Sequence, residues 1–246
     1  MTIKLYIGNV GSGKTAYAVR EMSKSNIQYI SNIRTNKIKN NMLIKTEHII
    51  KKDFIRTTKA GEDLFKYSFN KDFWIKLRDK YKQISLIIDE AHTVFSSRRS
   101  TSKQNVIMSD FIALARKLIG DQVSGYGDIV FISQLSRRID VIARDMCHQV
   151  KYFKMYYVKY CTICSACWAE HSDMPELQIR CPKCRSGQLK KRNFKMVVMS
   201  FQGIEKFMRW QDFGSNTYYS KKQINNIENI FSNYDTLQWD NLLSDY

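Results

Sequence analysis

Eight residues near the start of the chain have the types and the spacing of a phosphate-binding loop. They match the pattern Gly-x4-Gly-Lys-Ser/Thr at every fixed position and are Gly8, Asn9, Val10, Gly11, Ser12, Gly13, Lys14 and Thr15. The glycines allow the backbone to wrap phosphate groups closely, with amide N–H groups pointing inward at the start of the following helix. Lys14 would supply positive charge to the β- and γ-phosphates, and Thr15 a hydroxyl to Mg²⁺. The loop therefore predicts a site for ATP and Mg²⁺.

Two adjacent carboxylates, Asp89 and Glu90, directly follow an apolar segment, Leu86-Ile87-Ile88. A carboxylate at the end of a buried strand can approach the metal through its water shell, which is the role predicted for Asp89. Glu90 is the candidate for orienting and deprotonating an attacking water. An acidic pair that caps the next segment is the alternative interpretation. Together with the loop upstream, the pair favours hydrolysis over nucleotide binding alone.

A side-chain amide, Gln134, ends the next apolar strand and would lie beside the γ-phosphate if the two strands are parallel neighbours. There it could sense the phosphate and orient water, although a strand-terminal polar residue that faces solvent is the simpler explanation. An arginine from an adjacent subunit could also neutralise charge on the transferred phosphoryl group. Several arginines follow the acidic pair, and each could equally be a surface or DNA-facing charge: Arg98, Arg99, Arg116, Arg137, Arg138 and Arg144.

Five of the six cysteines lie between Cys161 and Cys184. In a cytosolic protein, where disulfides are rare, such clustering predicts a metal site rather than disulfides. The pairs Cys161-x2-Cys164 and Cys181-x2-Cys184, sixteen residues apart, have the spacing of a four-cysteine zinc ribbon. Four protein ligands leave no open position on Zn²⁺, so the expected role of the metal is structural.

The choice of cysteine ligands has an alternative, because Cys164-x2-Cys167 is an equally valid turn. We prefer Cys161, since Trp168 then lies where zinc ribbons often place an aromatic residue against the site. His171 is a weaker substitute ligand, and free thiols are the remaining interpretation. The segment Lys151–Ser200 has ten basic and three acidic residues, which favours contact of the ribbon with DNA or a partner protein.

Short apolar segments alternate with helical ones and predict a sheet of mostly parallel strands. Continuous apolarity, as in Ser85–Ile88, is typical of a central parallel strand that is covered on both faces. Apolar residues at helical spacing between Ile107 and Ile119 predict a helix before Gly120. The other expected core elements are strands at Thr2–Ile7, Ile27–Ile30 and Gly127–Ser133, and helices at about Lys14–Ser23 and Leu135–Met146.

Two strands rich in aromatic residues, Gln149–Val158 and Phe194–Phe201, flank the cysteines and predict a β-ribbon that carries the metal site at its tip. The expected fold is an α/β P-loop NTPase with a mostly parallel central sheet and an inserted β-ribbon zinc module. Its parts are an ATPase core at 1–158, a zinc ribbon at 159–190, and a last core strand with a tail at 191–246. One strand and one helix are expected in 34–82, and a helical fragment at Ser220–Phe231.

The net charge of +17 is large for 246 residues. Lysine and arginine that neutralise phosphates supply most non-specific affinity for nucleic acid, so the charge favours a DNA partner. An anionic membrane surface, or a solvated surface with no partner, would also account for it. No apolar stretch approaches the roughly 20 residues needed to span a bilayer, and the N-terminus does not resemble a secretory signal. A cytoplasmic protein with no transmembrane segment is expected.

The motifs also occur in a familiar order: GNVGSGKT, YISNI, LIIDEAHTVF, a helix with Ala115-Arg116-Lys117, DIVFISQ, then Arg144. Over residues 1–150 this order resembles the zonula-occludens-toxin-like and filamentous-phage assembly ATPases, and more broadly the viral genome-packaging ATPases of the FtsK–HerA group. The resemblance implies a RecA-like core, a ring of five or six subunits, and ATP hydrolysis coupled to movement of double-stranded DNA. A capsid or portal protein would be the docking partner, and the host cytoplasm the location.

The resemblance also implies roles for individual residues. Lys14 and Thr15 would bind phosphate and metal, Asp89 and Glu90 would be the Walker-B pair, and Gln134 the sensor at the end of a strand. Arg144 occupies the position of the arginine after the sensor strand, and Arg116 lies near a basic pair that the family often has. Membrane-anchored relatives have a transmembrane helix after the core, whereas this chain has the cysteine module, which favours a soluble packaging motor.

Two alternative functions remain at the level of the sequence. Thymidine-kinase-like enzymes also combine a P-loop, an acidic pair and a four-cysteine zinc site. Here, however, the DIVF segment starts 38 positions after Glu90, and about 60 residues follow the last cysteine pair, both more than such kinases would require. A nucleotide-binding regulator that binds DNA through its zinc ribbon is the other alternative.

Overall fold

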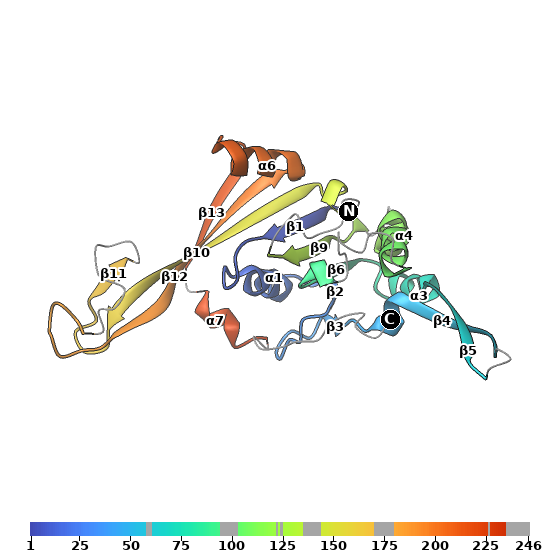
Figure 1. Cartoon of the computed structure of the whole chain (residues 1–246), viewed down its shortest axis with the longest axis horizontal. Coiled ribbons are helices and arrows are strands. Elements are labelled where there is room, and N and C mark those ends of the chain that lie inside the picture. Colours follow the sequence, from blue (N-terminus) through green and yellow to red (C-terminus); the bar gives the residue numbers. More distant parts are fainter. Residues whose placement is uncertain are drawn as a thin grey trace.

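A nine-stranded sheet runs through the protein in this computed structural model, in the order β13-β12-β10-β1-β9-β6-β2-β3 with β11 beside β10 (Figure 1). Its parallel half consists of β1 (Ile3–Ile7), β9 (Ile129–Ser133), β6 (Ile84–Ile88), β2 (Gln28–Ser31) and β3 (Asn41–Leu43). All residues of β6 and β9 are buried, as expected for central strands covered on both faces. The structure describes residues 1–57, 61–93, 103–121, 123, 125–134, 144–169, 180–225 and 227–234.

Helices cover both faces of the sheet. One face packs against α1 (Lys14–Ser23) and α7 (Glu228–Phe231), and the other against α3 (Lys71–Tyr81), α4 (Lys103–Leu118) and α6 (Gly203–Phe213). Trp74 of α3 is fully buried, with its ring centroid 4.9 Å from that of Phe111, and its indole N–H donates to the His48 carbonyl. Truncating such a buried aromatic residue typically costs about 3–5 kcal/mol, so these contacts fix the helices on the sheet.

A long antiparallel ribbon extends from the sheet. Its strands β10 (Gln149–Cys161) and β12 (Leu189–Gln202) pair along their whole length, with a bulge between Tyr156 and Tyr157. At its root β10 lies parallel to β1 as far as the pair Ile7–Tyr152, and β13 (Ser220–Asn225) pairs with β12. At the tip, β11 (Cys167–Ala169) pairs with β10, and Figure 1 shows this end standing clear of the helices. The predicted α/β fold with a mostly parallel sheet and an extended ribbon is confirmed.

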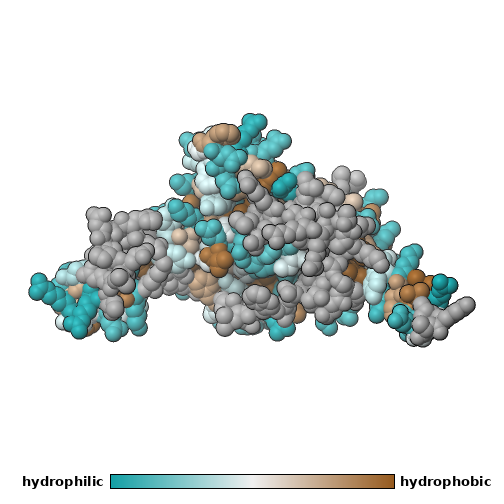
Figure 2. Space-filling view, viewed as in Figure 1, coloured by the Kyte–Doolittle hydropathy of each residue, from teal (hydrophilic) through white to brown (hydrophobic). Residues whose placement is uncertain are grey.

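A second hairpin protrudes on the opposite side of the core (Figure 1). It is formed by β4 (Ile50–Thr57) and β5 (Asp63–Phe69) after the short helix α2 (Thr46–Ile49). Its exposed apolar side chains include Phe54, Ile55 and Leu64, and they form the brown area at the far right of Figure 2. The remaining short elements are η1 (Ala91–Thr93), β7 (Gly120–Asp121) and β8 (Gly125–Tyr126).

The structure differs from the sequence prediction in three segments. The helical fragment expected at Ser220–Phe231 is wrong in its first half, because Ser220–Asn225 pairs with the free edge of β12, and only Glu228–Phe231 is helical. The described residues of 34–82, which leave out 58–60, form three strands and two helices rather than one of each, and helix α6 was not predicted. Most of the helix predicted at Leu135–Met146 lies outside the described residues. Within the described chain, no helix is both long and apolar enough to cross a bilayer.

Candidate nucleotide-binding site and cysteine cluster

The predicted phosphate-binding loop connects β1 to α1, which begins at Lys14. Gly11 and Gly13 have φ values of 71° and 87°, in the left-handed region that favours glycine. At Gly8 the reason for glycine is space, since a Cβ atom would lie 2.5 Å from the Phe153 carbonyl oxygen and 2.6 Å from Ser12 Oγ. The loop thus lies between β1 and α1, as the sequence predicts for a phosphate-binding loop. The amide groups at the N-terminus of α1 lie at the open side of the loop.

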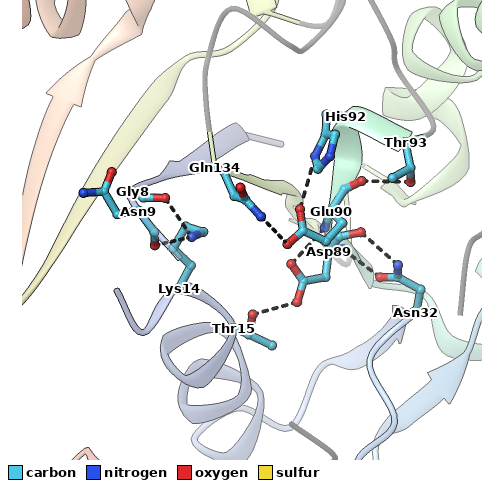
Figure 3. A network of polar contacts seen from close by, with 10 residues as sticks. All are labelled: Gly8, Asn9, Lys14, Thr15, Asn32, Asp89, Glu90, His92, Thr93 and Gln134. Atoms are coloured by element: carbon cyan, nitrogen blue, oxygen red, sulfur yellow. Dashed lines mark hydrogen bonds and ion pairs between the residues drawn. The ribbon is translucent and has the colours of Figure 1, made fainter. Parts of the chain in front are cut away.

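The Lys14 ammonium lies within this loop (Figure 3). Its Nζ donates to the carbonyl oxygens of Gly8 at 2.8 Å and Asn9 at 3.0 Å, and the side chain is almost fully buried. Burial lowers the pKa of Lys14, while the nearby carboxylates of Asp89 and Glu90 partly oppose that effect. The loop therefore concentrates positive charge at the position where the sequence predicts the β- and γ-phosphates.

The two residues predicted to serve Mg²⁺ are in direct contact. Thr15 Oγ1 donates to Asp89 Oδ2 at 2.6 Å, although 74 residues separate them in the chain. Burial raises the pKa of Asp89, and the hydrogen bond from Thr15 opposes that shift. A hydroxyl and a carboxylate are hard oxygen ligands of the kind that Mg²⁺ prefers, so the pair fits that ion.

Glu90 has a backbone conformation that is uncommon for its type. Its φ is 49°, in the left-handed region, a placement that costs of order 1 kcal/mol for a non-glycine residue and is often found at functional sites. Gln134 Nε2 donates to Glu90 Oε1 at 3.3 Å, and His92 Nδ1 lies 3.1 Å from Oε2 (Figure 3). The buried His92 Nδ1 is at ion-pair distance but is not aligned for a hydrogen bond. The carboxylate is thus held between an amide and an imidazole while remaining about half exposed.

Asn32 is a site residue to which the sequence analysis assigned no role. Its Oδ1 accepts from the Asp89 amide at 2.7 Å, and its Nδ2 donates to the Asp89 carbonyl at 2.9 Å. The Asn32 side chain therefore fixes both the amide and the carbonyl group of Asp89, and the Asp89 carbonyl leads directly into Glu90. The sequence shows that Asn32 follows one predicted strand and Asp89 another, but the pairing of β2 with β6 as parallel neighbours is seen only in the structure.

Of the arginines predicted to act in a neighbouring site, the structure describes the side chain of Arg144 alone. Arg144 is partly buried, and its Nε lies 3.8 Å from Asp145 Oδ1. No hydrogen bond or ion pair in the described part of the chain joins it to the loop or to Glu90. Arg116 lies on α4, and its side chain is outside the described residues, as are Arg98, Arg99, Arg137 and Arg138. An arginine finger from a neighbouring subunit therefore stays a prediction.

The root of the ribbon packs directly on the phosphate-binding loop. Tyr157 Oη donates to the Gly11 carbonyl at 3.1 Å. A Cβ atom at Gly13 would lie 2.7 Å from Met196 Sδ and 2.8 Å from Met155 Cε, so the thioethers fill the space that a larger residue would need. The loop is therefore closed on one side by β10 and β12.

Four cysteines converge at the tip of the ribbon. The Sγ atoms of Cys161, Cys164, Cys181 and Cys184 all lie within 4.8 Å of one another, with 3.5 Å between Cys161 and Cys184 and 3.6 Å between Cys164 and Cys181. Cys167 is exposed and outside this group, its Sγ lying 3.5 Å from the Ser165 carbonyl. Four convergent sulfur atoms without an open side fit a tetrahedral Zn²⁺ better than a hard cation.

Backbone amides surround this cysteine cluster in the way that metal-binding turns require. The amides of Cys164 and Cys184 donate to the sulfur atoms three residues before them, Cys161 and Cys181, each at 3.4 Å. Amide hydrogen bonds, first from Gly187, lower the pKa of Cys184 to about 6. Such bonds favour the thiolate, which is the form that binds a metal. His171, the substitute ligand considered from the sequence, and the side chain of Trp168 lie outside the described residues.

The parallel sheet, the glycine loop between the first strand and helix, and the acidic pair after a buried strand place the protein in the class of P-loop NTPases. The chain belongs to the zonular occludens toxin (Zot) family, because the model of that family matches residues 2–197. No curated protein matches the sequence.

The chain is also similar to solved structures, one over nearly its whole length and another over a smaller part. The crystal structure of the N-terminal domain of zonular occludens toxin from Neisseria meningitidis is similar over 95% of this chain and 98% of that one, with 14% sequence identity and a TM-score of 0.51. The genome packaging NTPase B204 from Sulfolobus turreted icosahedral virus 2, in complex with ATP-gammaS, is similar over 62% of this chain and 74% of its own, with 19% identity and a TM-score of 0.34. At these identities the likeness to the Neisseria protein concerns the fold.

Proposed function

We propose that the protein is an ATP-hydrolysing motor that moves double-stranded DNA during viral genome packaging or virion assembly. The observation that carries the hydrolytic part is the position of Glu90, a half-exposed carboxylate held by Gln134 and His92 next to the Thr15–Asp89 pair. A carboxylate placed in this way can accept the proton of an attacking water. A site that only bound nucleotide would not need it.

The chain's own residues divide the work of phosphoryl transfer. Lys14 would place its charge on the β- and γ-phosphates, while Thr15 and Asp89 would hold Mg²⁺, which neutralises charge on the same phosphates when bound. Gln134, whose amide already contacts Glu90, would orient the water. Asn32 keeps Asp89 and Glu90 in register with the loop through its two backbone hydrogen bonds.

The DNA and ring parts of the proposal depend on other observations. Membership of the Zot family, the net charge of +17 and the order of the motifs favour a DNA-moving ring of five or six subunits. In such a ring Arg116 or Arg144 would complete the site of a neighbouring subunit, and a capsid or portal protein would dock the motor in the host cytoplasm. Zn²⁺ would be bound by Cys161, Cys164, Cys181 and Cys184 and would hold the ribbon tip together.

The decisive experiment measures ATP hydrolysis with and without double-stranded DNA for the natural protein and for Glu90→Gln. We expect DNA to stimulate turnover, and the substitution to lower it by about 10²–10⁴-fold, as removal of a general base does. Nucleotide affinity should stay within a few fold, because the loop and Lys14 are unchanged. The particle mass with ATP and DNA, measured by light scattering, should correspond to a ring.

Three outcomes would contradict this proposal. A strict monomer under all conditions would leave the arginine from a neighbouring subunit without a role. Phosphorylation of thymidine together with no effect of DNA on turnover would favour the thymidine-kinase-like alternative instead. Nucleotide-dependent DNA binding without any hydrolysis would favour the regulator.

A further inference from the structure

The ribbon beyond its contact with β1 has a charge pattern that the nucleotide site does not explain. We call the described residues 154–169 and 180–195 the basic arm; they include nine basic residues and no acidic one. The basic residues are Lys154, Lys159, Arg180, Lys183, Arg185, Lys190, Lys191, Arg192 and Lys195. The three acidic residues of this region are all in the segment 170–179, which is outside the described residues. The teal surface at the left end of Figure 2 is the tip of this arm.

The basic residues occur on both faces of the ribbon. Lys190 is paired with Tyr160, while the preceding residue on β10, Lys159, is paired with Lys191. Because successive residues of a strand point to opposite faces, Lys159 and Lys190 belong to different faces. Lys154, Lys183 and Lys190 are exposed, and no salt bridge to a described residue neutralises any of the three. Both faces of the ribbon therefore carry basic residues, with the exposed Lys154 and Lys190 on one face and Lys159 on the other.

The dimensions of the arm match those of a duplex. From Tyr152, the last partner of β1, to Cys161 the strand rises about 30 Å at roughly 3.3 Å per residue, close to the ~34 Å of one helical turn of B-DNA. As far as Tyr157, before β11 joins β10, the arm is a two-stranded ribbon, which is narrow enough for the major groove, about 12 Å wide, where phosphates would flank it on both sides. Lys154 and Lys195 lie 5.1 and 5.2 Å from the centre of the Tyr156 ring, which keeps two charges together at the base of the arm.

A membrane surface fits the arm less well. An element that lies in a membrane interface needs one apolar face opposite a charged one. Here both faces carry lysine, and Ile163 is the one exposed large apolar residue among the arm's side chains that the structure describes, a set that leaves out Trp168 and Phe194. Charge on both faces suits a partner that surrounds the ribbon, whereas a flat bilayer would contact one face.

We propose that the basic arm is the surface on which this protein holds double-stranded DNA, through contacts with the phosphate backbone that do not depend on sequence. The proposal rests on the proposed function, since it names where the DNA lies on the motor. Contacts of this kind displace counterions, so the binding constant should fall steeply with salt. Met155 and Tyr157 of the arm contact the phosphate-binding loop, whereas Lys154, Lys183 and Lys190 make no hydrogen bond or ion pair with it among the described residues. Neutralising these three lysines should therefore leave the basal activity of the nucleotide site unchanged.

The test compares two triple variants with the same loss of charge. Lys154→Gln, Lys183→Gln and Lys190→Gln neutralise the arm, and Lys71→Gln, Lys76→Gln and Lys80→Gln neutralise three exposed lysines on α3 as the matched control. Fluorescence anisotropy with a 40-base-pair duplex of arbitrary sequence is measured over a range of salt concentrations. For the arm variant we expect the slope of log K against log salt to decrease in magnitude by about 2 to 3, and affinity at 0.1 M salt to fall roughly 10²-fold. The control should bind as the natural protein does.

The outcomes separate this inference from the proposed function. If both variants bind the duplex like the natural protein while DNA still stimulates turnover, the arm is not the DNA-binding surface, but the proposed motor function is still supported. If the natural protein neither binds the duplex nor changes its ATP turnover when the duplex is added, the proposed motor function is wrong. The proposed role of the arm in DNA binding is then wrong as well. Loss of binding to phosphatidylserine vesicles by the arm variant, with duplex binding intact, would assign the arm to membranes and overturn the inference. Basal ATP hydrolysis and zinc content should be unchanged in both variants.

Discussion

The nucleotide site and the cysteine cluster belong to the same sheet but are assembled in opposite ways. The first brings together residues that are far apart in sequence, such as Thr15 and Asp89, at the ends of parallel strands. The second is formed by two short turns at the end of one hairpin, where each pair of cysteines is only three residues apart. The nucleotide site therefore depends on how the whole core is packed, whereas the cysteine cluster depends on local turns and on whatever its four sulfur atoms bind.

This difference predicts that damage at one site should leave the other largely intact. The exception is the root of the ribbon, which contacts the phosphate-binding loop through the hydrogen bond from Tyr157 to Gly11 and through Met155 and Met196 beside Gly13. Three substitutions test how far the independence extends, and they are ordered by the size of the expected effect.

Substitution of a cluster cysteine should have the largest effect. Cys181→Ser removes one thiolate of four, and we expect zinc content, measured by atomic absorption on the purified protein, to fall from about one per chain to near zero. Cys167→Ser is the matched control and should keep its zinc, since that sulfur is exposed and outside the cluster. Basal ATP turnover should change less than about twofold in both variants. The reverse pattern, with zinc lost on changing Cys167, would make Cys167 a ligand.

Loss of the Asn32 side chain should have an intermediate effect. Asn32→Ala removes both hydrogen bonds to the Asp89 backbone, and at about 1 kcal/mol each we expect kcat to fall roughly 10- to 30-fold. Asn40→Ala is the control, because Asn40 Nδ2 also donates to two backbone carbonyls, those of Ser25 and Ile27, away from the carboxylates. Both variants should lose similar thermal stability, but only the first should lose turnover. Equal losses of turnover would show that Asn32 acts through stability alone.

Removal of the contact between the two regions should have the smallest effect. Tyr157→Phe deletes one neutral hydrogen bond to the phosphate-binding loop, about 0.5–1.5 kcal/mol, so we expect ATP affinity to weaken by two- to tenfold. Zinc content should not change. If DNA stimulates turnover of this variant as fully as that of the natural protein, the contact does not couple the two regions.

The sequence predicted those parts of the site whose geometry is local. The loop Gly8–Thr15 carries its own turn residues, and the cysteine pairs carry their own spacing, so both could be located without a fold. Asp89 and Gln134 were placed because apolar strands end at them. Asn32 was missed because its role depends on β2 and β6 being neighbours, which the sequence does not state.

The errors in the fold have a similar origin. Ser220–Asn225 has no strong period of its own, and its strand conformation comes from pairing with the exposed edge of β12. The hairpin Ile50–Phe69 was unclear because its strands are largely exposed and lack a continuous apolar side. In both cases tertiary contacts determine the structure more than local preference does.

The bulge in the ribbon gives it a point at which it bends, because β12 has one extra residue, Phe194, opposite Tyr156 and Tyr157. It lies between Tyr156 and Tyr157, immediately beside the residue that is bonded to Gly11, and a bulge is the point at which a strand bends most readily. The bending point of the ribbon thus lies next to the phosphate-binding loop, while the proposed DNA contacts extend to the tip of the ribbon. A small rotation at the loop would be amplified along the strand beyond the bulge, which rises about 17 Å from Tyr156 to Cys161 at roughly 3.3 Å per residue. The distance between labels on the tip and on α3, measured by electron paramagnetic resonance, should change with bound nucleotide, and a constant distance would show that the ribbon is a fixed strut.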